Sequence, residues 1–192
     1  MTIDTKDMIN SIMGSLSRID YIKPSDIPNI DLYMDQVTTF MDTHLASSKR
    51  YPQEKTMINN YAKNNLLPPP VKKKYTKEHL LVMIFIYYFK GILSITDIQS
   101  LLTPITERYF HSPEFNIEDL YNEVFSLEKE QVERLQKDIL RSYQTSTETF
   151  SQAPETDQEF LKLFSFICLL SFDVYVKKQL IEKLIDELPK KE

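Results

Sequence analysis

The chain has 192 residues, of which 42% are hydrophobic and 27% charged, and its 11 Tyr and 11 Phe supply the bulk of a globular core. It has two glycines, Gly14 and Gly91, which excludes glycine-rich phosphate-binding loops and disfavours a sheet-rich fold. The net charge of −5 conceals a basic segment, because residues 49–90 carry a net charge of +7 and the remainder −12.

The first third of the chain is predicted to be helical and interrupted by prolines. Apolar residues recur at helical spacing over residues 8–19, and Pro24 and Pro28 then end any helix. A second helix is expected from Asp31 to about residue 45. Pro52 suits the first turn of a third helix, which should stop near Asn64 or Asn65, because Asn tolerates the left-handed conformation of a helix C-terminus.

The middle of the chain combines an extended basic piece with two more helices. Three prolines at 68–70 and the run VKKKY favour an extended strand or wing. Thr76 can cap a fourth helix that Gly91 closes, and Ser94 with Asp97 has the spacing of a capping box at the start of a short helix that ends near Leu102.

The last part, residues 104–192, is predicted to be a helical subdomain. One long helix is expected from about Asn116 to Tyr143 and another over about 157–188, whose first half is apolar nearly all round. Some other element must cover that half, either preceding helices or a second subunit. The apolar stretches 80–89 and 160–176 are too short to span a membrane, which needs about 20 residues.

The segment from Lys55 to Leu102 closely resembles the DNA-binding half of regulators of the mercury-resistance (MerR-like) kind. The shared pattern is a helix ending in Tyr61, a Leu-Leu-Pro turn, a basic wing ending in Tyr75, a capped helix and a short last helix. The segment also resembles a bacterial family known as domain of unknown function 1836. The resemblance implies a mainly α fold with a winged helix-turn-helix domain, a short β wing and a C-terminal helical subdomain. The expected divisions are 1–29, 30–103 and 104–192.

The resemblance also implies a DNA-binding transcriptional regulator. The helix at about 52–64 would enter the major groove, and the wing at 71–75 would hold phosphates. Asn59 stands where the MerR-like pattern usually has Arg. This change removes a positive charge, but the Asn side chain can pair its donor and its acceptor with the edge of an adenine. The residues expected to contact DNA lie on that helix and on the wing: Gln53, Lys55, Asn59, Asn60, Lys63, Lys72, Lys73, Lys74 and Tyr75.

Other functions are weighed against this one. Lysine runs and helix-surface asparagines are often only solvated, so a protein-interaction module that keeps the winged fold without binding DNA is the alternative. The three histidines have no ligand spacing, and no nucleophile with a base can be assembled, so we expect no metal, cofactor or catalysis. The single Cys168 and the acidic first residues favour the cytoplasm, and the MerR-like habit suggests a homodimer through the C-terminal helices.

Overall fold

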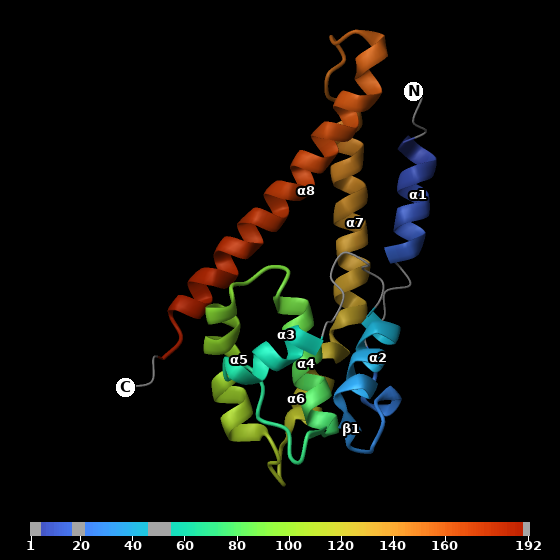
Figure 1. Cartoon of the computed structure of the whole chain (residues 1–192). Helices are drawn as coiled ribbons and strands as arrows, with labels where there is room; N and C mark the ends of the chain where they lie inside the picture. The colour runs from blue at the N-terminus through green and yellow to red at the C-terminus, as the bar shows by residue number, and fades with distance from the viewer. Residues whose placement is uncertain (1–4, 17–21, 46–54, 190–192) are drawn as a thin grey trace. The chain divides into compact units, whose positions relative to one another are not determined.

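The structure is a computed structural model that describes residues 5–16, 22–45 and 55–189. It is mainly helical with a small two-stranded sheet, which confirms the predicted fold class at this level. The chain divides into two compact units, one formed by residues 1–21 and 126–181 and the other by residues 22–125 and 182–192. Figure 1 labels the α-helices of both units and strand β1. In the described parts of the chain, no helix combines the length and apolar character needed to cross a membrane.

The unit of residues 22–125 begins with two short elements and holds five α-helices among its described residues. In chain order these elements are η1 (Pro24–Asp26), β1 (Leu32–Tyr33), α2 (Met34–Leu45), α3 (Lys55–Lys63), β2 (Lys74–Tyr75), α4 (Lys77–Phe89), α5 (Ile95–Tyr109) and α6 (Ile117–Ser126). Strands β1 and β2 pair antiparallel, with Leu32 opposite Tyr75 and Tyr33 opposite Lys74. The predicted division at residue 103 falls inside α5.

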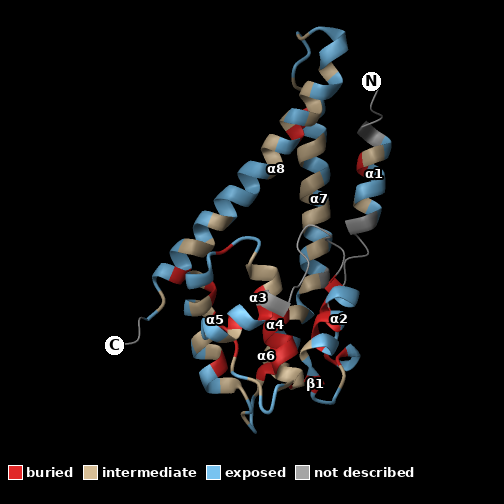
Figure 2. Cartoon of the chain, in the orientation of Figure 1, coloured by how far each residue is buried: buried red, intermediate tan, exposed pale blue. Residues whose placement is uncertain are grey.

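Helix α4 is the centre of this unit. All residues from His79 to Ile86 are buried, which is why the sequence is apolar all round over this helix (Figure 2). Its Phe85 packs against Tyr121 and Phe125 of α6, with ring centroids 5.5 Å apart in both cases. The Tyr121 hydroxyl donates to the carbonyl of Ile22 at 2.8 Å, so the first and last parts of the unit are joined through its core.

Helix α5 differs from the prediction that it ends near Leu102. It continues to Tyr109 with Pro104 inside it. Proline removes one helical hydrogen bond, but Ile98, Leu102 and Thr106 form one buried face that extends past it. The Thr106 hydroxyl also donates to the carbonyl of Leu102 at 3.1 Å. Burial of this face therefore outweighs the local break.

The second unit contains α1 (Thr5–Leu16), α7 (Glu128–Thr147) and most of α8 (Glu155–Asp186). The helix expected over 116–143 is divided at Leu127 into α6 and α7, and α7 runs on to Thr147. Tyr143 of α7 packs on Phe166 of α8 with ring centroids 5.4 Å apart, and Phe166 is buried. This contact joins the two helices of the hairpin.

Candidate nucleic-acid interface

Helix α3 has one buried and one exposed face. Ile58 and Tyr61 are 0% and 4% exposed, so these side chains face inward. Asn59, Asn60 and Lys63 are exposed, and because Lys63 lies four and three residues after the two asparagines, all three belong to one polar face. Burial raises the pKa of Tyr61 to about 12, so this tyrosine acts as a core residue with a neutral hydroxyl.

The end of α3 fixes the direction in which the chain leaves this helix. Asn65 has a left-handed φ of 53°, as its residue type predicted. The N–H of Leu66 donates to the carbonyl of Tyr61 at 2.9 Å, and the N–H of Asn65 donates to the carbonyl of Ala62 at 3.3 Å. This pair of bonds is the Schellman motif, and it carries the chain into the buried residues Leu66 and Leu67.

A tight hairpin follows the prolines and places two lysines at its tip. The N–H of Lys74 donates to the carbonyl of Val71 at 2.9 Å, so Lys72 and Lys73 are the two central residues of the turn. Both are left-handed, with φ values of 51° and 64°, as in a type I′ turn. Such a turn prefers Asn-Gly, because a side chain with a Cβ costs about 1–2 kcal/mol in this conformation. Both lysines are exposed.

The base of the hairpin is held by β1 and by the core. The Lys74 ammonium lies 5.3 Å from the centroid of the Tyr33 ring on β1. Tyr75 is 3% exposed, and burial raises the pKa of its hydroxyl. Tyr75 was expected to contact DNA, but its side chain is in the core and does not belong to the exposed surface. Both α3 and β2 pack against α2, so helix and hairpin belong to one body.

The other residues that the sequence singled out are placed unevenly. Asn59, Asn60, Lys63, Lys72 and Lys73 are exposed, and Lys74 is half-buried. Gln53 lies outside the described residues. Lys55 is the first residue of α3, but its side chain also lies outside them.

Two further lysines of the basic segment contact side chains of the same unit. The Lys77 ammonium is 2.8 Å from a carboxylate oxygen of Glu118, so most of its charge is balanced. The Lys90 ammonium is buried 5.0 Å from the centroid of the Tyr87 ring, and desolvation lowers the pKa of this lysine. The exposed positive charge of the described residues in this segment is therefore concentrated on Lys63 and the hairpin.

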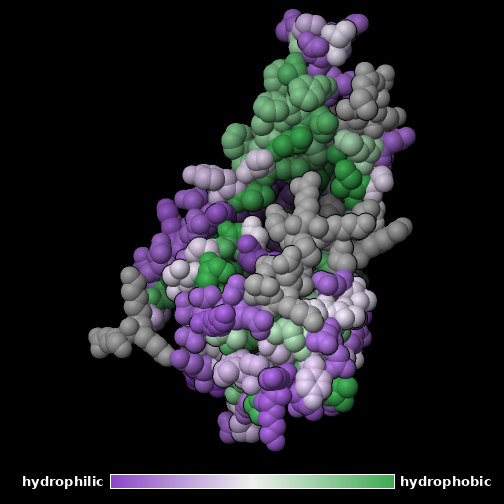
Figure 3. Space-filling model, in the orientation of Figure 1, coloured by the Kyte–Doolittle hydropathy of each residue, from purple (hydrophilic) through white to green (hydrophobic). Residues whose placement is uncertain are grey.

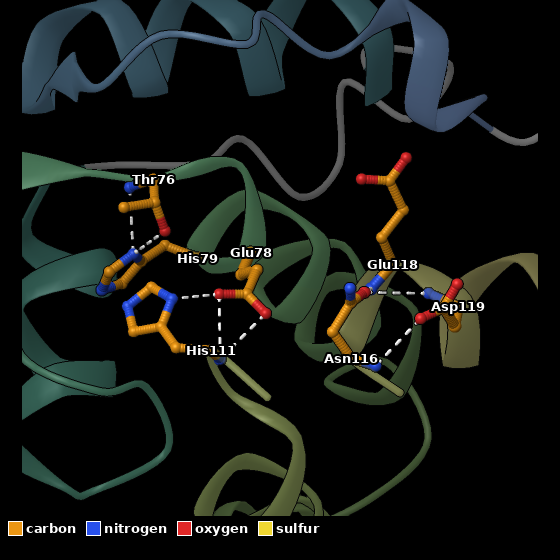
Figure 4. A network of polar contacts seen from close by, with 7 residues as sticks. All are labelled: Thr76, Glu78, His79, His111, Asn116, Glu118 and Asp119. Carbon is orange, nitrogen blue, oxygen red and sulfur yellow. Dashed lines mark hydrogen bonds and ion pairs between the residues drawn. The ribbon is translucent and has the colours of Figure 1, made fainter. Parts of the chain in front are cut away.

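A buried histidine anchors the chain directly after the hairpin. His79 Nδ1 accepts a hydrogen bond from the N–H of Thr76 at 3.0 Å and lies 2.8 Å from the Thr76 hydroxyl (Figure 4). Desolvation lowers the pKa of His79 to about 4, although the nearby carbonyls of Pro69 and Pro68 favour the charged form. The neutral ring thus caps α4 where a capping box usually has Glu or Gln.

The same region ties α4 to the loop between α5 and α6. Both carboxylate oxygens of Glu78 accept from the N–H of His111, at 3.0 and 3.1 Å, and one of them contacts His111 Nδ1 (Figure 4). His111 is left-handed, with a φ of 61°. Asn116 Oδ1 accepts from the N–H groups of Glu118 and Asp119 and so caps α6. The side chains of this cluster hold one another, which is a structural role.

A family model described as "Domain of unknown function (DUF1836)" matches residues 22–124. This span is more than half of the chain. The chain belongs to the DUF1836 family. The match nearly coincides with the compact unit of residues 22–125, so the DUF1836 domain includes α5 and α6 as well as the segment on which the resemblance rests. No curated protein and no solved structure matches the chain.

Neither a metal-ligand cluster nor a cavity with shifted titratable groups is found among the described residues of the DUF1836 domain. No group of three or more His, Cys, Asp or Glu side chains among them could hold a metal ion. A cavity of about 420 Å³ lies beside α5, and one of about 440 Å³ lies beside α2. Neither cavity is lined by a described residue whose pKa is shifted. Those residues are Tyr61, Tyr75, His79, Tyr87 and Lys90.

Sequence reasoning missed two features of this DUF1836 domain. A turn with Lys at both central positions carries no turn signature, since neither Asn nor Gly is present. The three-residue spacing between Thr76 and His79 is that of a capping box and could have predicted the role of His79. It was missed because the third helical position of a capping box usually has Glu or Gln.

Proposed function

We propose that the DUF1836 domain is a winged helix-turn-helix domain that binds double-stranded DNA, and that the chain is a transcriptional regulator. In this proposal α2 and α3 are the two helices of the motif, and the 71–75 hairpin is the wing. The exposed face of α3 enters the major groove, where Asn59 and Asn60 can each pair with the edge of an adenine. Lys63 and the wing lysines bind phosphates and set the register.

The observation that carries the proposal is the lysine pair at the tip of the hairpin. Lys72 and Lys73 each adopt a left-handed φ that Asn or Gly would adopt at lower cost. Backbone strain of this kind, about 1–3 kcal/mol for each residue, is concentrated at functional positions, because the surrounding structure must enforce it. Two ammonium groups at a strained, exposed turn are suited to bind two phosphates.

The proposed surface predicts a defined dependence on salt. Four described lysines, Lys63, Lys72, Lys73 and Lys74, are available to phosphate. Each neutralised phosphate contributes about −0.9 to the slope of log K against log salt, so these four predict a slope of roughly −3 to −4. Affinity for random duplex DNA should therefore fall about 100-fold between about 50 and 200 mM salt.

The test uses the full chain and a fluorescent random DNA duplex. Replacing Lys72→Asn together with Lys73→Gly suits the turn better, so folding is maintained while two charges are lost. The slope should become shallower by about 2. The matched control, Lys137→Gln with Arg141→Gln on α7, removes the same charge from another unit and should leave the slope unchanged. Failure to bind at about 50 mM salt, or an affinity that does not respond to salt, overturns the proposal.

The alternative is a protein-interaction module that keeps the winged fold. It is favoured by Asn59, which stands where the MerR-like pattern has the positive charge of Arg. If circular dichroism shows that the chain is folded and the chain does not bind DNA, the result favours the protein-interaction module. We further propose that the chain is not catalytic and acts in the cytoplasm. We also propose a homodimer through the C-terminal helices.

A further inference from the structure

The cavity of about 420 Å³ beside α5 has its second wall at the C-terminal end of α8. Both walls belong to the unit of residues 22–125 and 182–192, and Figure 1 shows this end of α8 beside α5. Pockets that bind small organic molecules have volumes of about 300–1,000 Å³. The cavity is therefore large enough to hold a small ligand.

The wall that α5 contributes is polar. Four uncharged polar side chains, at positions 96, 99, 100 and 103, lie on one face of the helix: Thr96, Gln99, Ser100 and Thr103. None of them forms a side-chain hydrogen bond with another residue that the structure describes. In Figure 3, the surface over α5 is mostly purple, which marks hydrophilic residues. This wall thus offers donors and acceptors that the protein itself leaves unused.

Thr103 is the clearest case of an unused polar group. Its Oγ1 atom is shielded from solvent and has no hydrogen-bond partner. By contrast, the hydroxyl of Thr106 on the same helix donates to the carbonyl of Leu102 at 3.1 Å. A buried polar atom without a partner costs free energy, so the wall of the cavity is not fully satisfied by the protein alone.

The wall at the end of α8 has the opposite character. Its apolar side chains are Ile185, Leu188 and Pro189, and Ile185 is 8% exposed. These side chains cannot pair with the hydroxyl and amide groups across the cavity. A ligand with a hydrogen-bonding edge and an aliphatic edge would complement both walls. No aromatic side chain of the described residues lines the cavity, so it has no surface for stacking a flat ring.

Both charged residues of the lining are acidic. They are Asp97 on α5 and Asp186, the last residue of α8, and no described Lys, Arg or His lines the cavity. One oxygen of Asp97 accepts from the Ser94 hydroxyl at 2.7 Å, and the other has no hydrogen bond within the described part of the chain. The lining therefore favours a cation. Because no group of three or more described His, Cys, Asp or Glu side chains could hold a metal ion, an organic ammonium group fits better.

We propose that the cavity between α5 and the end of α8 binds a small aliphatic diamine. Its ammonium groups pair with Asp97 and Asp186, and its methylene chain packs against Ile185 and Leu188. The free hydroxyl and amide groups of α5 accept the remaining ammonium hydrogens. The proposal does not rest on DNA binding, because every residue that it uses lies outside α3 and the hairpin.

The first test compares three four-carbon compounds that differ in charge: putrescine, which is a dication, neutral butanediol, and the dianion succinate. Each is titrated into the isotope-labelled full chain and followed by the amide signals in nuclear magnetic resonance spectra. Putrescine should shift signals of residues 96–103 and 185–188 and saturate them. The other two compounds should leave these signals in place. No saturable shift with putrescine, or an equal response to succinate, overturns the proposal.

The second test removes the carboxylates one at a time. Asp97→Asn keeps an oxygen that can accept from Ser94, and Asp186→Asn changes an exposed position. Each should weaken putrescine binding about 3- to 5-fold, as expected for partly exposed ion pairs, and both together about 10-fold or more. Ser100→Phe fills the cavity without changing its charge and should abolish the saturable shifts. Circular dichroism of each variant reports whether the helices are kept.

The matched control separates this site from general attraction to an acidic chain. Asp138→Asn with Asp173→Asn removes the same charge from exposed positions of the other unit, and should bind putrescine as the wild type does. If this control weakens binding as much as the two cavity changes do, the attraction is unspecific and the proposal is wrong. Unchanged binding by Ser100→Phe likewise overturns it, because the ligand must then lie elsewhere.

Discussion

Because His79 is neutral and buried, stability in acid tests how the 71–75 hairpin is anchored. Its pKa is lowered from 6.5 to about 4 by desolvation, so a proton binds more tightly to the unfolded chain than to the folded one. Protonation would also put a proton on Nδ1, which accepts the hydrogen bond from the N–H of Thr76. The folded state is therefore favoured while the ring is neutral.

The sign and size of the effect follow from this lowered pKa. The stabilisation is fully present above pH 6.5 and is lost as the pH falls from 6.5 to about 4. The shift corresponds to roughly 3 kcal/mol over that interval, with a slope of up to about 1.4 kcal/mol per pH unit. His79 is 1% exposed, so solvent screening does not reduce this contribution much.

The assay compares wild-type protein with His79→Gln in urea unfolding from pH 7 to 4, followed by circular dichroism because the chain has no tryptophan. Glutamine keeps an acceptor for the Thr76 N–H but does not titrate. Wild-type stability should fall by roughly 3 kcal/mol more than that of the variant. His44→Gln, which changes a histidine of α2, should keep the wild-type decline. Parallel curves for wild type and His79→Gln would refute the reasoning.

Three more effects on stability are expected, each measured by urea unfolding at pH 7. Replacing Lys72→Asn and Lys73→Gly should raise the free energy of unfolding by about 1–2 kcal/mol in total, since both residues are left-handed. Asn65→Gly should raise it by up to about 1 kcal/mol for the same reason, and an unchanged value would argue that Asn65 is not strained. Ile58→Ala should lower it by about 2–5 kcal/mol, because Ile58 is fully buried on α3.

Local signals in the sequence were reliable where one residue decides the backbone. Asn65 adopts the left-handed conformation that ends α3, and Ser94 with Asp97 forms the predicted capping box. These features depend on neighbours within a few residues, so a single chain segment contains the information. The three-residue spacing of Ile58 and Tyr61 is likewise a local feature, and it places both buried side chains on one face of α3.

Features that depend on distant packing could not be predicted in the same way. The extension of α5 through Pro104 requires the buried face of Leu102 and Thr106, and the sequence does not say what covers that face. The apolar pattern continues from α6 into α7, so it does not indicate the division at Leu127. For the candidate interface, the sequence predicted the lysines but not the left-handed turn that presents two of them.

The two unusual features of the hairpin lie on either side of β2 and act on the same strand. Before it, the turn holds Lys72 and Lys73 in a conformation that their side chains disfavour. After it, the neutral ring of His79 fixes the N–H of Thr76, and between them Tyr75 is buried. If the tip binds a phosphate as proposed, a strand anchored in this way loses little conformational freedom on binding, so less of the interaction energy is spent on ordering. Replacing the turn by Asn-Gly should therefore make the hairpin more stable and its grip on DNA weaker, a combination that a merely solvated lysine pair would not produce.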